Sequence, residues 1–172
     1  MFVWLGWALF VLHWRPFTVP HLVWDSFAAC PAMIFSSLAV LVFPGRLRIT
    51  DLDRCSGAAA ELAVAEMMRR TGWRNVQVIG GAGDGGVDIL AVSPRGRRMA
   101  VQVKRTLRPV GPGVIRDLSG AMRQQRYRGR VPMLVTIARV TQAASTAAAC
   151  HHIGVAGRAE VIRWLERARV RR

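Results

Sequence analysis

Two short segments decide the fold of this chain: Val87-Asp-Ile-Leu-Ala-Val92 and Met99-Ala-Val-Gln-Val-Lys-Arg105. Both are rich in β-branched residues, and the linking residues 93–98 contain the Pro and Gly that are typical of a turn. The pattern therefore predicts a β-hairpin. Because side chains alternate between the two faces of a strand, one buried face is expected to carry the apolar residues Val87, Ile89, Ala91, Met99, Val101 and Val103.

The opposite face of this hairpin would carry three polar side chains. Asp88 lies on the first strand and Gln102 and Lys104 lie on the second, provided that Asp88 is opposite Gln102 or Lys104 and not Val103. Lys104 is the one lysine in a chain with 24 arginines, which indicates a position where a compact ammonium is preferred to a planar guanidinium. This grouping is suited to holding a divalent metal beside a scissile phosphate, as in a nuclease.

A glycine-rich segment, Gly80-Gly-Ala-Gly-Asp-Gly-Gly86, precedes the hairpin and contains a formal G-x-G-x-x-G. A dinucleotide site would need a helix to begin there, but strand-like residues follow from Val87. A P-loop is excluded as well, since no Lys-Ser/Thr pair follows. The segment is predicted to be a turn that ends a strand and lets a ligand approach the backbone closely.

Several motifs together resemble the Mrr-like restriction endonuclease family of the PD-(D/E)xK nuclease superfamily. They are Gly83-Asp-Gly-Gly-Val-Asp-Ile89, Val101-Gln-Val-Lys-Arg105, Val110-Gly111 and Leu118-Ser-Gly-Ala121. The resemblance runs from about Ser56 to Leu165. It implies an α/β fold, namely a restriction-endonuclease-like sandwich with a mixed central β-sheet flanked by helices. It also implies hydrolysis of DNA phosphodiester bonds with Mg²⁺ or Mn²⁺ as cofactor.

The resemblance assigns roles to four residues. Asp88 matches the metal-binding acid, Gln102 the middle position of the (D/E/Q)-x-K element, and Lys104 the catalytic lysine. Glu61 matches a helical Glu, since Gly72 closes that helix, so the implied metal ligands are Asp88, Gln102 and Glu61. Gln102 offers only a neutral carbonyl oxygen, so the site would depend on Glu61 for its second carboxylate. A solvated helix face remains an equal alternative for Glu61.

The rest of this region alternates between helical and strand-like patterns. We expect helices over 58–70, 114–125, 141–151 and 159–169, and strands over 76–79, 131–137 and 153–155. Ser56 is the expected N-cap of the first helix. These elements would build an α/β sandwich around a mixed sheet.

Positive charge is concentrated after residue 45. Residues 46–172 hold 24 Arg and Lys against nine Asp and Glu, so the whole net charge of +15 belongs to this segment. Such an imbalance predicts a polyanionic partner, most simply double-stranded DNA, although anionic lipid is the alternative. The candidate phosphate contacts follow the lysine-bearing strand: Arg105, Arg108, Arg116, Arg123, Arg126, Arg128 and Arg130.

The N-terminal part of the chain is apolar. Residues 26–43 form an uncharged run of 18 residues, near the lower end of the ~17–25 that span a bilayer as a helix. We predict a transmembrane helix there. Residues 1–14 are also uncharged, but as a helix they reach only about 21 Å against a hydrocarbon core of ~30 Å, so one or two spans are expected. Interface anchors would be Trp4, Trp7, Trp14 and Trp24.

The flanking charges predict the orientation of this anchor. Arg46, Arg48 and Arg54 follow the span directly, which places the basic domain on the cytoplasmic side of a bacterial inner membrane. A cleaved signal peptide is disfavoured because there is no basic n-region. The three cysteines are an odd number and contain no C-x-x-C, so neither a disulfide framework nor a zinc site is indicated.

The expected organisation is a membrane anchor over 1–45, a basic linker over 46–55 and a nuclease domain over 56–172. The expected function is a membrane-anchored, Mg²⁺-dependent DNA endonuclease in restriction, defence or DNA processing, which could act as a homodimer. One alternative is a DNA-binding module whose neutral Gln102 leaves too weak a metal site for cleavage. Another is a membrane protein whose arginines contact lipid.

Overall fold

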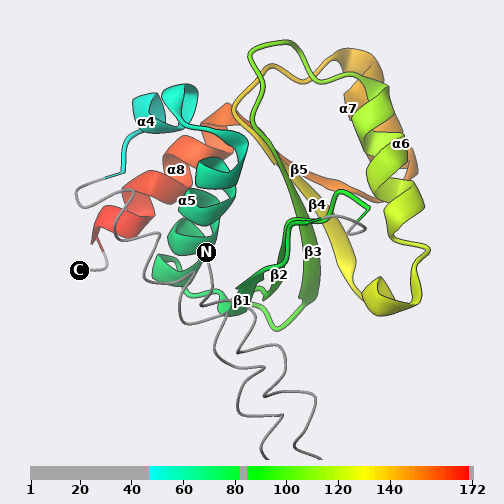
Figure 1. Ribbon diagram of the computed structural model, residues 1–172, viewed down its shortest axis with the longest axis horizontal. Coiled ribbons are helices and arrows are strands. Elements are labelled where there is room, and N and C mark those ends of the chain that lie inside the picture. Colours follow the sequence, from blue (N-terminus) through cyan, green and yellow to red (C-terminus); the bar gives the residue numbers. More distant parts are fainter. Residues whose placement is uncertain (1–46, 82–84, 171–172) are drawn as a thin grey trace, which may run out of the picture. The chain divides into compact units, whose positions relative to one another are not determined.

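The computed structural model describes residues 47–81 and 85–170 of the chain (Figure 1). The predicted membrane anchor over 1–45 lies outside these residues. No helix within the described ranges is long and apolar enough to cross a bilayer.

A five-stranded mixed sheet forms the centre of the described domain. Its strands lie in the order β1 (Arg74–Val78), β2 (Ile89–Val92), β3 (Arg98–Lys104), β4 (Val131–Thr136) and β5 (Gly154–Ala156). The pairs β1/β2 and β2/β3 are antiparallel, whereas β3/β4 and β4/β5 are parallel. Short turns can join antiparallel strands, but parallel neighbours require longer crossover connections, which here contain helices.

Helices cover both faces of this sheet (Figure 1). One side carries α4 (Ile49–Arg54), α5 (Gly57–Arg70) and α8 (Arg158–Val170), and the other carries α6 (Pro112–Ala121) and α7 (Gln142–Cys150). A short 3-10 turn, Gln125–Tyr127, follows α6. The predicted sandwich with a mixed sheet is therefore confirmed.

Each layer has its own apolar cluster. On the α5 side, Met67 and Met68 pack with Ile89 and Val101 of the hairpin. On the α6 side, Ile115 and Leu118 pack with strand residues and with the small alanines of α7. The α5 helix begins as expected, since the Ser56 hydroxyl accepts a hydrogen bond from the backbone of Ala59 at 3.2 Å.

The structure corrects the predicted linker over 46–55. Residues 49–54 form helix α4, and the side chain of Leu52 is only 2% exposed within the α5-side cluster. This segment is therefore part of the folded domain. A six-residue helix with a single fully buried residue leaves too little periodicity in the sequence to be recognised.

The structure also corrects the expected apolar face of the hairpin. Ile89 and Ala91 lie in the α5-side cluster, but Val87 is buried in the α6-side cluster. Ideal alternation fails at Asp88, whose backbone N–H donates to the carbonyl of Val101 although the register pairs Val101 with Ile89. This irregularity turns the residues before Ile89 relative to the rest of the strand.

Candidate active site

The end of β1 and the start of β2 meet beside the glycine-rich segment, next to β3. The backbone N–H of Ile79 donates to the carbonyl of Asp88 at 2.8 Å, and the N–H of Asp88 donates to the carbonyl of Val101 at 2.9 Å. The residue after β1 and the residue before β2 are thereby held beside the middle of β3. Gly80 and Asp88 consequently become spatial neighbours.

Two carboxylates converge at Gly80. A methyl group on Gly80 would lie 2.8 Å from Oε2 of Glu61 and 3.8 Å from Oδ1 of Asp88. Glu61 comes from α5 and Asp88 from the irregular start of the hairpin, and both side chains are half-buried. Two acidic groups held this close form a site of negative potential that favours a cation.

The second oxygen of Asp88 is fixed by the neighbouring strand. Oδ2 accepts a hydrogen bond of 2.6 Å from the backbone N–H of Val103. Val103 lies between Gln102 and Lys104, so this bond ties the carboxylate to the strand that bears the other two predicted site residues. It also orients Oδ1 toward the Glu61 side.

Gln102 lies just beyond the last regular pair of β2 and β3. The regular pairing ends with Ile89 opposite Val101, and Asp88 instead bonds the carbonyl of Val101 through its backbone N–H. The side-chain nitrogen of Gln102 faces Gly86, where a methyl group would approach it to 2.7 Å. The Oε1 atom is buried, and no described residue donates a hydrogen bond to it. A buried carbonyl oxygen in this state is costly unless a cation or water meets it.

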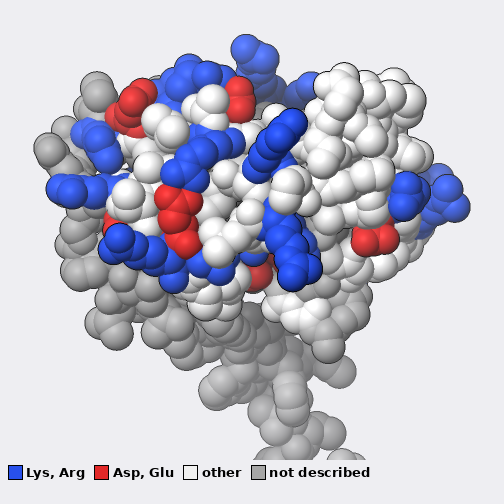
Figure 2. Space-filling view, turned by 90° about the horizontal axis from the view of Figure 1, so that it is seen from above, with Lys and Arg blue, Asp and Glu red and all other residues white. Residues whose placement is uncertain are grey.

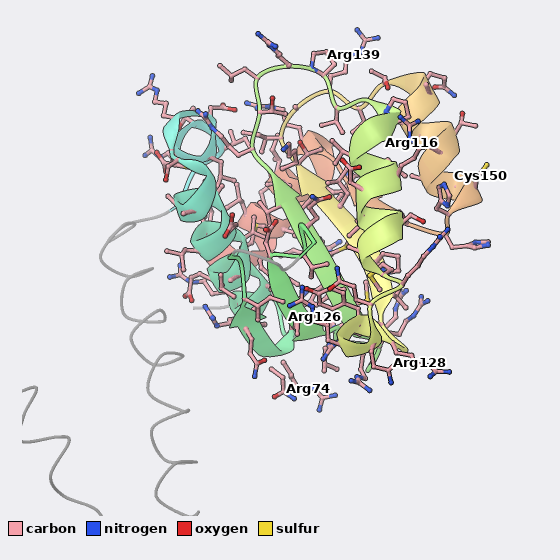
Figure 3. All side chains as sticks on the ribbon, turned by 45° about the vertical axis from the view of Figure 1, so that its right-hand side comes forward. Arg74, Arg116, Arg126, Arg128, Arg139 and Cys150 are labelled. Carbon is pink, nitrogen blue, oxygen red and sulfur yellow. The ribbon has the colours of Figure 1, made fainter. Side chains whose placement is uncertain are left out.

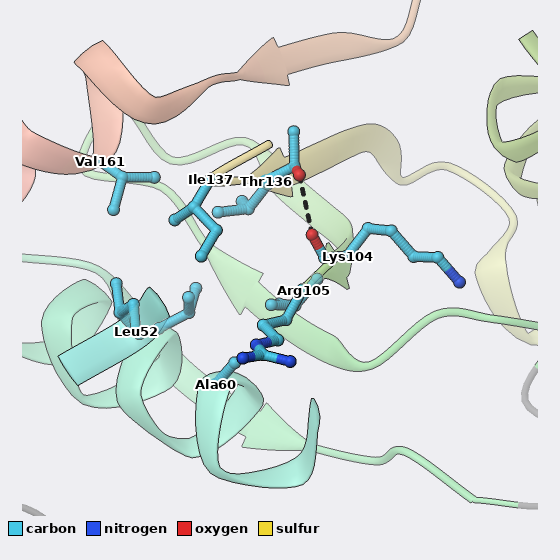
Figure 4. A pocket seen from close by; sticks show the side chains of 10 residues that line it. Leu52, Ala60, Lys104, Arg105, Thr136, Ile137 and Val161 are labelled. Carbon is cyan, nitrogen blue, oxygen red and sulfur yellow. Dashed lines mark hydrogen bonds between the residues drawn. The ribbon is translucent and has the colours of Figure 1, made fainter. Parts of the chain in front are cut away.

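Lys104 ends strand β3 and is exposed. Its side chain points away from that of Arg105, which lies against the α4 and α5 side (Figure 4). Within the described part of the chain Lys104 forms no ion pair. The structure thus brings Glu61 and Asp88 together at Gly80 and places Gln102 against Gly86. Lys104, at the end of the same strand as Gln102, is open to solvent.

The matched family is that of the Mrr catalytic domain, described as restriction endonuclease, and the match covers residues 52–165. The chain belongs to this family. Restriction endonucleases are hydrolases that cleave DNA. The matched range includes all four residues described above. No curated protein and no solved structure matches the chain.

One of the predicted DNA contacts, Arg105, binds within the protein instead. The guanidinium of Arg105 donates to the backbone carbonyl of Asp53 in α4 at 2.6 Å. The carboxylate of Asp53 in turn pairs with Arg158 of α8 at 2.6 and 2.8 Å. The structure places Arg105 in an intramolecular network that sequence reasoning missed, because its partners lie more than 50 residues away. By contrast, the side chains of Arg108, Arg116 and Arg123 are exposed.

A small cavity lies on the same side as this network (Figure 4). Its volume is about 10 Å³, and it is lined mainly by apolar side chains, including Leu52, Val103 and Val161. That volume holds at most about one water molecule. The cavity is too small for a substrate.

A metal in this restriction endonuclease would have few ligands. The described residues contain no group of three or more His, Cys, Asp and Glu side chains placed to hold a metal. The available set is two carboxylates, Glu61 and Asp88, with the buried Oε1 of Gln102. All three supply hard oxygen atoms, which Mg²⁺ prefers, so this donor set fits a divalent cation.

Proposed function

We propose that this member of the Mrr family cleaves DNA with Mg²⁺, or Mn²⁺, held by Asp88, Glu61 and Gln102, and that Lys104 is its catalytic lysine. One observation carries the proposal. Two carboxylates converge on Gly80, and Gln102 on the neighbouring strand β3 carries a buried amide oxygen that receives no hydrogen bond from any described residue. Carboxylate and amide oxygens of this kind are the ligands that a divalent cation such as Mg²⁺ prefers.

The roles of the side chains follow from their chemistry. Bound between these oxygens, Mg²⁺ would supply a Lewis acid for the scissile phosphate. Asp88 and Glu61 provide the negative charge that retains the cation, and Gln102 provides a neutral ligand. The exposed ammonium of Lys104 can reach a substrate, where it would orient the attacking water or stabilise the charge that builds on the phosphate.

A second candidate function is a DNA-binding module that does not cleave. It is favoured by the neutral Gln102, because a site with one carboxylate fewer binds a divalent cation more weakly. Its fold and DNA affinity would be the same. Only metal-dependent cleavage separates it from the first proposal.

The deciding experiment is a nicking assay on modified and unmodified plasmid, with and without Mg²⁺. We expect the parent protein to cleave in the presence of Mg²⁺, and both Lys104→Ala and Lys104→Arg to fail, since a guanidinium is larger and planar. Arg108→Ala serves as the matched control for loss of one exposed positive charge near the site. Cleavage by Lys104→Ala at the parent rate would contradict the proposed catalytic role.

We also propose that residues 26–43 anchor the enzyme in the bacterial inner membrane with the nuclease domain in the cytoplasm. The support is the uncharged 18-residue run followed by Arg46, Arg48 and Arg54. The protein should remain with membranes after an alkaline wash, and its C-terminus should be protected from external protease. Recovery in the soluble fraction would contradict this.

A further inference from the structure

Arginines gather at the end of the sheet that lies opposite the candidate active site. Arg74 pairs with Val92 across β1 and β2, and Val92 pairs with Arg98 across β2 and β3. Arg130 directly precedes β4, whose first residue pairs with Met99, so Arg130 lies beside Arg98. These three arginines therefore form a row across about 15 Å, or three strand separations.

Other arginines extend this row. Arg95 and Arg97 lie in the turn between β2 and β3, and Arg128 follows the 3-10 turn. Figure 3 shows Arg74 and Arg128 toward this end of the sheet and Arg116 and Arg139 toward the other. We call this set the basal surface, and it consists of Arg74, Arg95, Arg97, Arg98, Arg128 and Arg130. All but the half-buried Arg130 are exposed.

The basal surface is not neutralised by acidic side chains. In the described ranges, ion pairs join Glu66 to Arg69 and Arg70, Asp53 to Arg158, and Glu160 to Arg163, and none includes a basal arginine. Figure 2, which looks at the other end of the molecule, shows acidic side chains among the basic ones. The positive charge of the basal surface is thus uncompensated within the described domain.

Arg130 is the basal arginine that is partly buried and incompletely hydrogen-bonded. Its Nε is buried and has no hydrogen-bond acceptor among the described residues, and its Nη1 reaches the carbonyl of Met99 only at 3.4 Å. Burial lowers the pKa of the Arg130 guanidinium, and the positive charge of Arg98 lowers it further. An anion seated between these two arginines would relieve both effects.

We infer that the basal surface binds the phosphate backbone of duplex DNA, at a place distinct from the scissile phosphate. The inference rests on the proposed function for the identity of the polyanion. Arg98 and Lys104 are the two ends of β3, six residues and therefore about 20 Å apart. A duplex that reaches from one to the other needs about 6 base pairs at 3.4 Å each.

The chemistry favours nucleic acid over a lipid surface. Proteins that lie on membranes combine basic residues with apolar side chains that enter the bilayer. Among the described residues the exposed large hydrophobic side chain is Leu107, which follows β3 at the other end of the sheet. The basal surface offers guanidinium groups alone, and these match phosphate oxygens bidentately.

The test measures DNA binding of the full chain in detergent, without divalent metal, as a function of salt. The variant Arg98→Gln/Arg128→Gln removes two basal charges, and Arg54→Gln/Arg167→Gln removes two exposed charges from α4 and α8 as the control. We expect the slope of log affinity against log salt to become shallower by about 1.8 for the basal variant, at about 0.9 per phosphate contact, and to be unchanged for the control. The length of duplex occupied per protein should also shorten by about 6 base pairs in the basal variant.

Two outcomes would overturn the inference. One is a basal variant with the parent's slope and site size. The other is a basal variant that keeps its DNA affinity but loses its preference for detergent micelles doped with phosphatidylserine over undoped micelles, which would make the surface a lipid contact. Because no cleavage is measured, this result is independent of the nicking assay that tests the proposed function.

Discussion

The hydroxyl of Thr136 donates a hydrogen bond of 2.7 Å to the backbone carbonyl of Lys104. Thr136 is only 2% exposed and pairs with Lys104 in the parallel register of β3 and β4. Its oxygen also accepts the backbone N–H of Ala138 at 3.1 Å. The backbone of the one lysine is thereby fixed from the strand beside it, although the lysine side chain remains exposed.

Replacement of Thr136 by Val should show how much the hydrogen bond to the Lys104 carbonyl contributes to stability and cleavage. The two side chains have similar shape, but Val leaves the Lys104 carbonyl without its side-chain partner, which typically costs about 1–3 kcal/mol when the group is buried. We expect lower stability in urea unfolding and slower cleavage with unchanged DNA affinity. Thr136→Ser retains the hydroxyl and should recover most of the cleavage rate, whereas equal activity of the Val and Ser variants would argue against a positioning role.

Asp88→Asn should abolish Mg²⁺-dependent cleavage and leave the fold intact. The amide oxygen can still accept the hydrogen bond from Val103, but the negative charge that retains the cation is lost. Glu66→Gln is the matched control, because Glu66 lies on the same helix as Glu61 but pairs with Arg70. Titration calorimetry with Mg²⁺ should show weaker binding for Asp88→Asn and parent-like binding for Glu66→Gln.

Gln102→Glu should strengthen metal binding. The substitution keeps the side-chain shape and turns a buried amide oxygen into an anionic ligand beside Asp88. Affinity for Mg²⁺ should rise, and cleavage should be preserved or faster at low Mg²⁺ concentration. If Gln102 were only structural, the new charge would be buried without a partner, and the variant would instead lose stability without any gain in metal affinity.

Gly80→Ala should disturb the site without altering any of its ligands. The new methyl group would lie 2.8 Å from Oε2 of Glu61, closer than carbon and oxygen atoms normally approach, so Glu61 has to move. We expect weaker Mg²⁺ binding and slower cleavage. Gly120→Ala on α6 is the control, since a methyl group there meets nothing within 4 Å. A Gly80→Ala protein with parent-like metal affinity would show that Glu61 is not a ligand.

Low pH should weaken the ion pair between Asp53 and Arg158. The hydrogen-bonded guanidinium of Arg158 lowers the pKa of Asp53 in the folded protein. The ion pair therefore stabilises the fold fully above the unfolded-state pKa of about 3.9. This stabilisation is lost as the pH falls through the lower pKa of the folded state. Asp53→Asn should therefore be less stable than the parent near pH 7. The difference in urea midpoint should shrink at about pH 2, and a constant difference would exclude this ionic contribution.

Local sequence patterns were sufficient for most of the fold. Alternation of β-branched residues predicted the hairpin, and Ser56 and Gly72 predicted the limits of α5. The pattern failed where non-local contacts determine the structure. Val87 has the same character as Ile89, but it is buried in the other layer, next to the irregular hydrogen bond from Asp88 to Val101.

In the candidate site, too, local sequence predicted some features, whereas non-local contacts determine others. Asp88, Gln102 and Lys104 stand out because an acid, an amide and the one lysine occur at fixed spacing on two strands. The convergence of Glu61 and Asp88 on Gly80 could not be derived from spacing, because it depends on how α5 packs against the sheet. The catalytic roles of these residues remain predictions. The position of Arg105 was equally hidden, since its acceptor is a backbone carbonyl 52 residues earlier.

The first and last described helices are fastened to each other. Asp53 of α4 pairs with Arg158 at the start of α8, and near the end of α8 a side-chain nitrogen of Arg169 lies 3.5 Å from the carbonyl of Leu47. These two contacts connect the N-terminal and C-terminal helices of the described domain directly, without involving the sheet. Tension applied at residue 47 should detach α4 first. The strands that hold Asp88 and Gln102 should bear the force only after that. A single-molecule pulling experiment should accordingly show a small early extension before the sheet unravels.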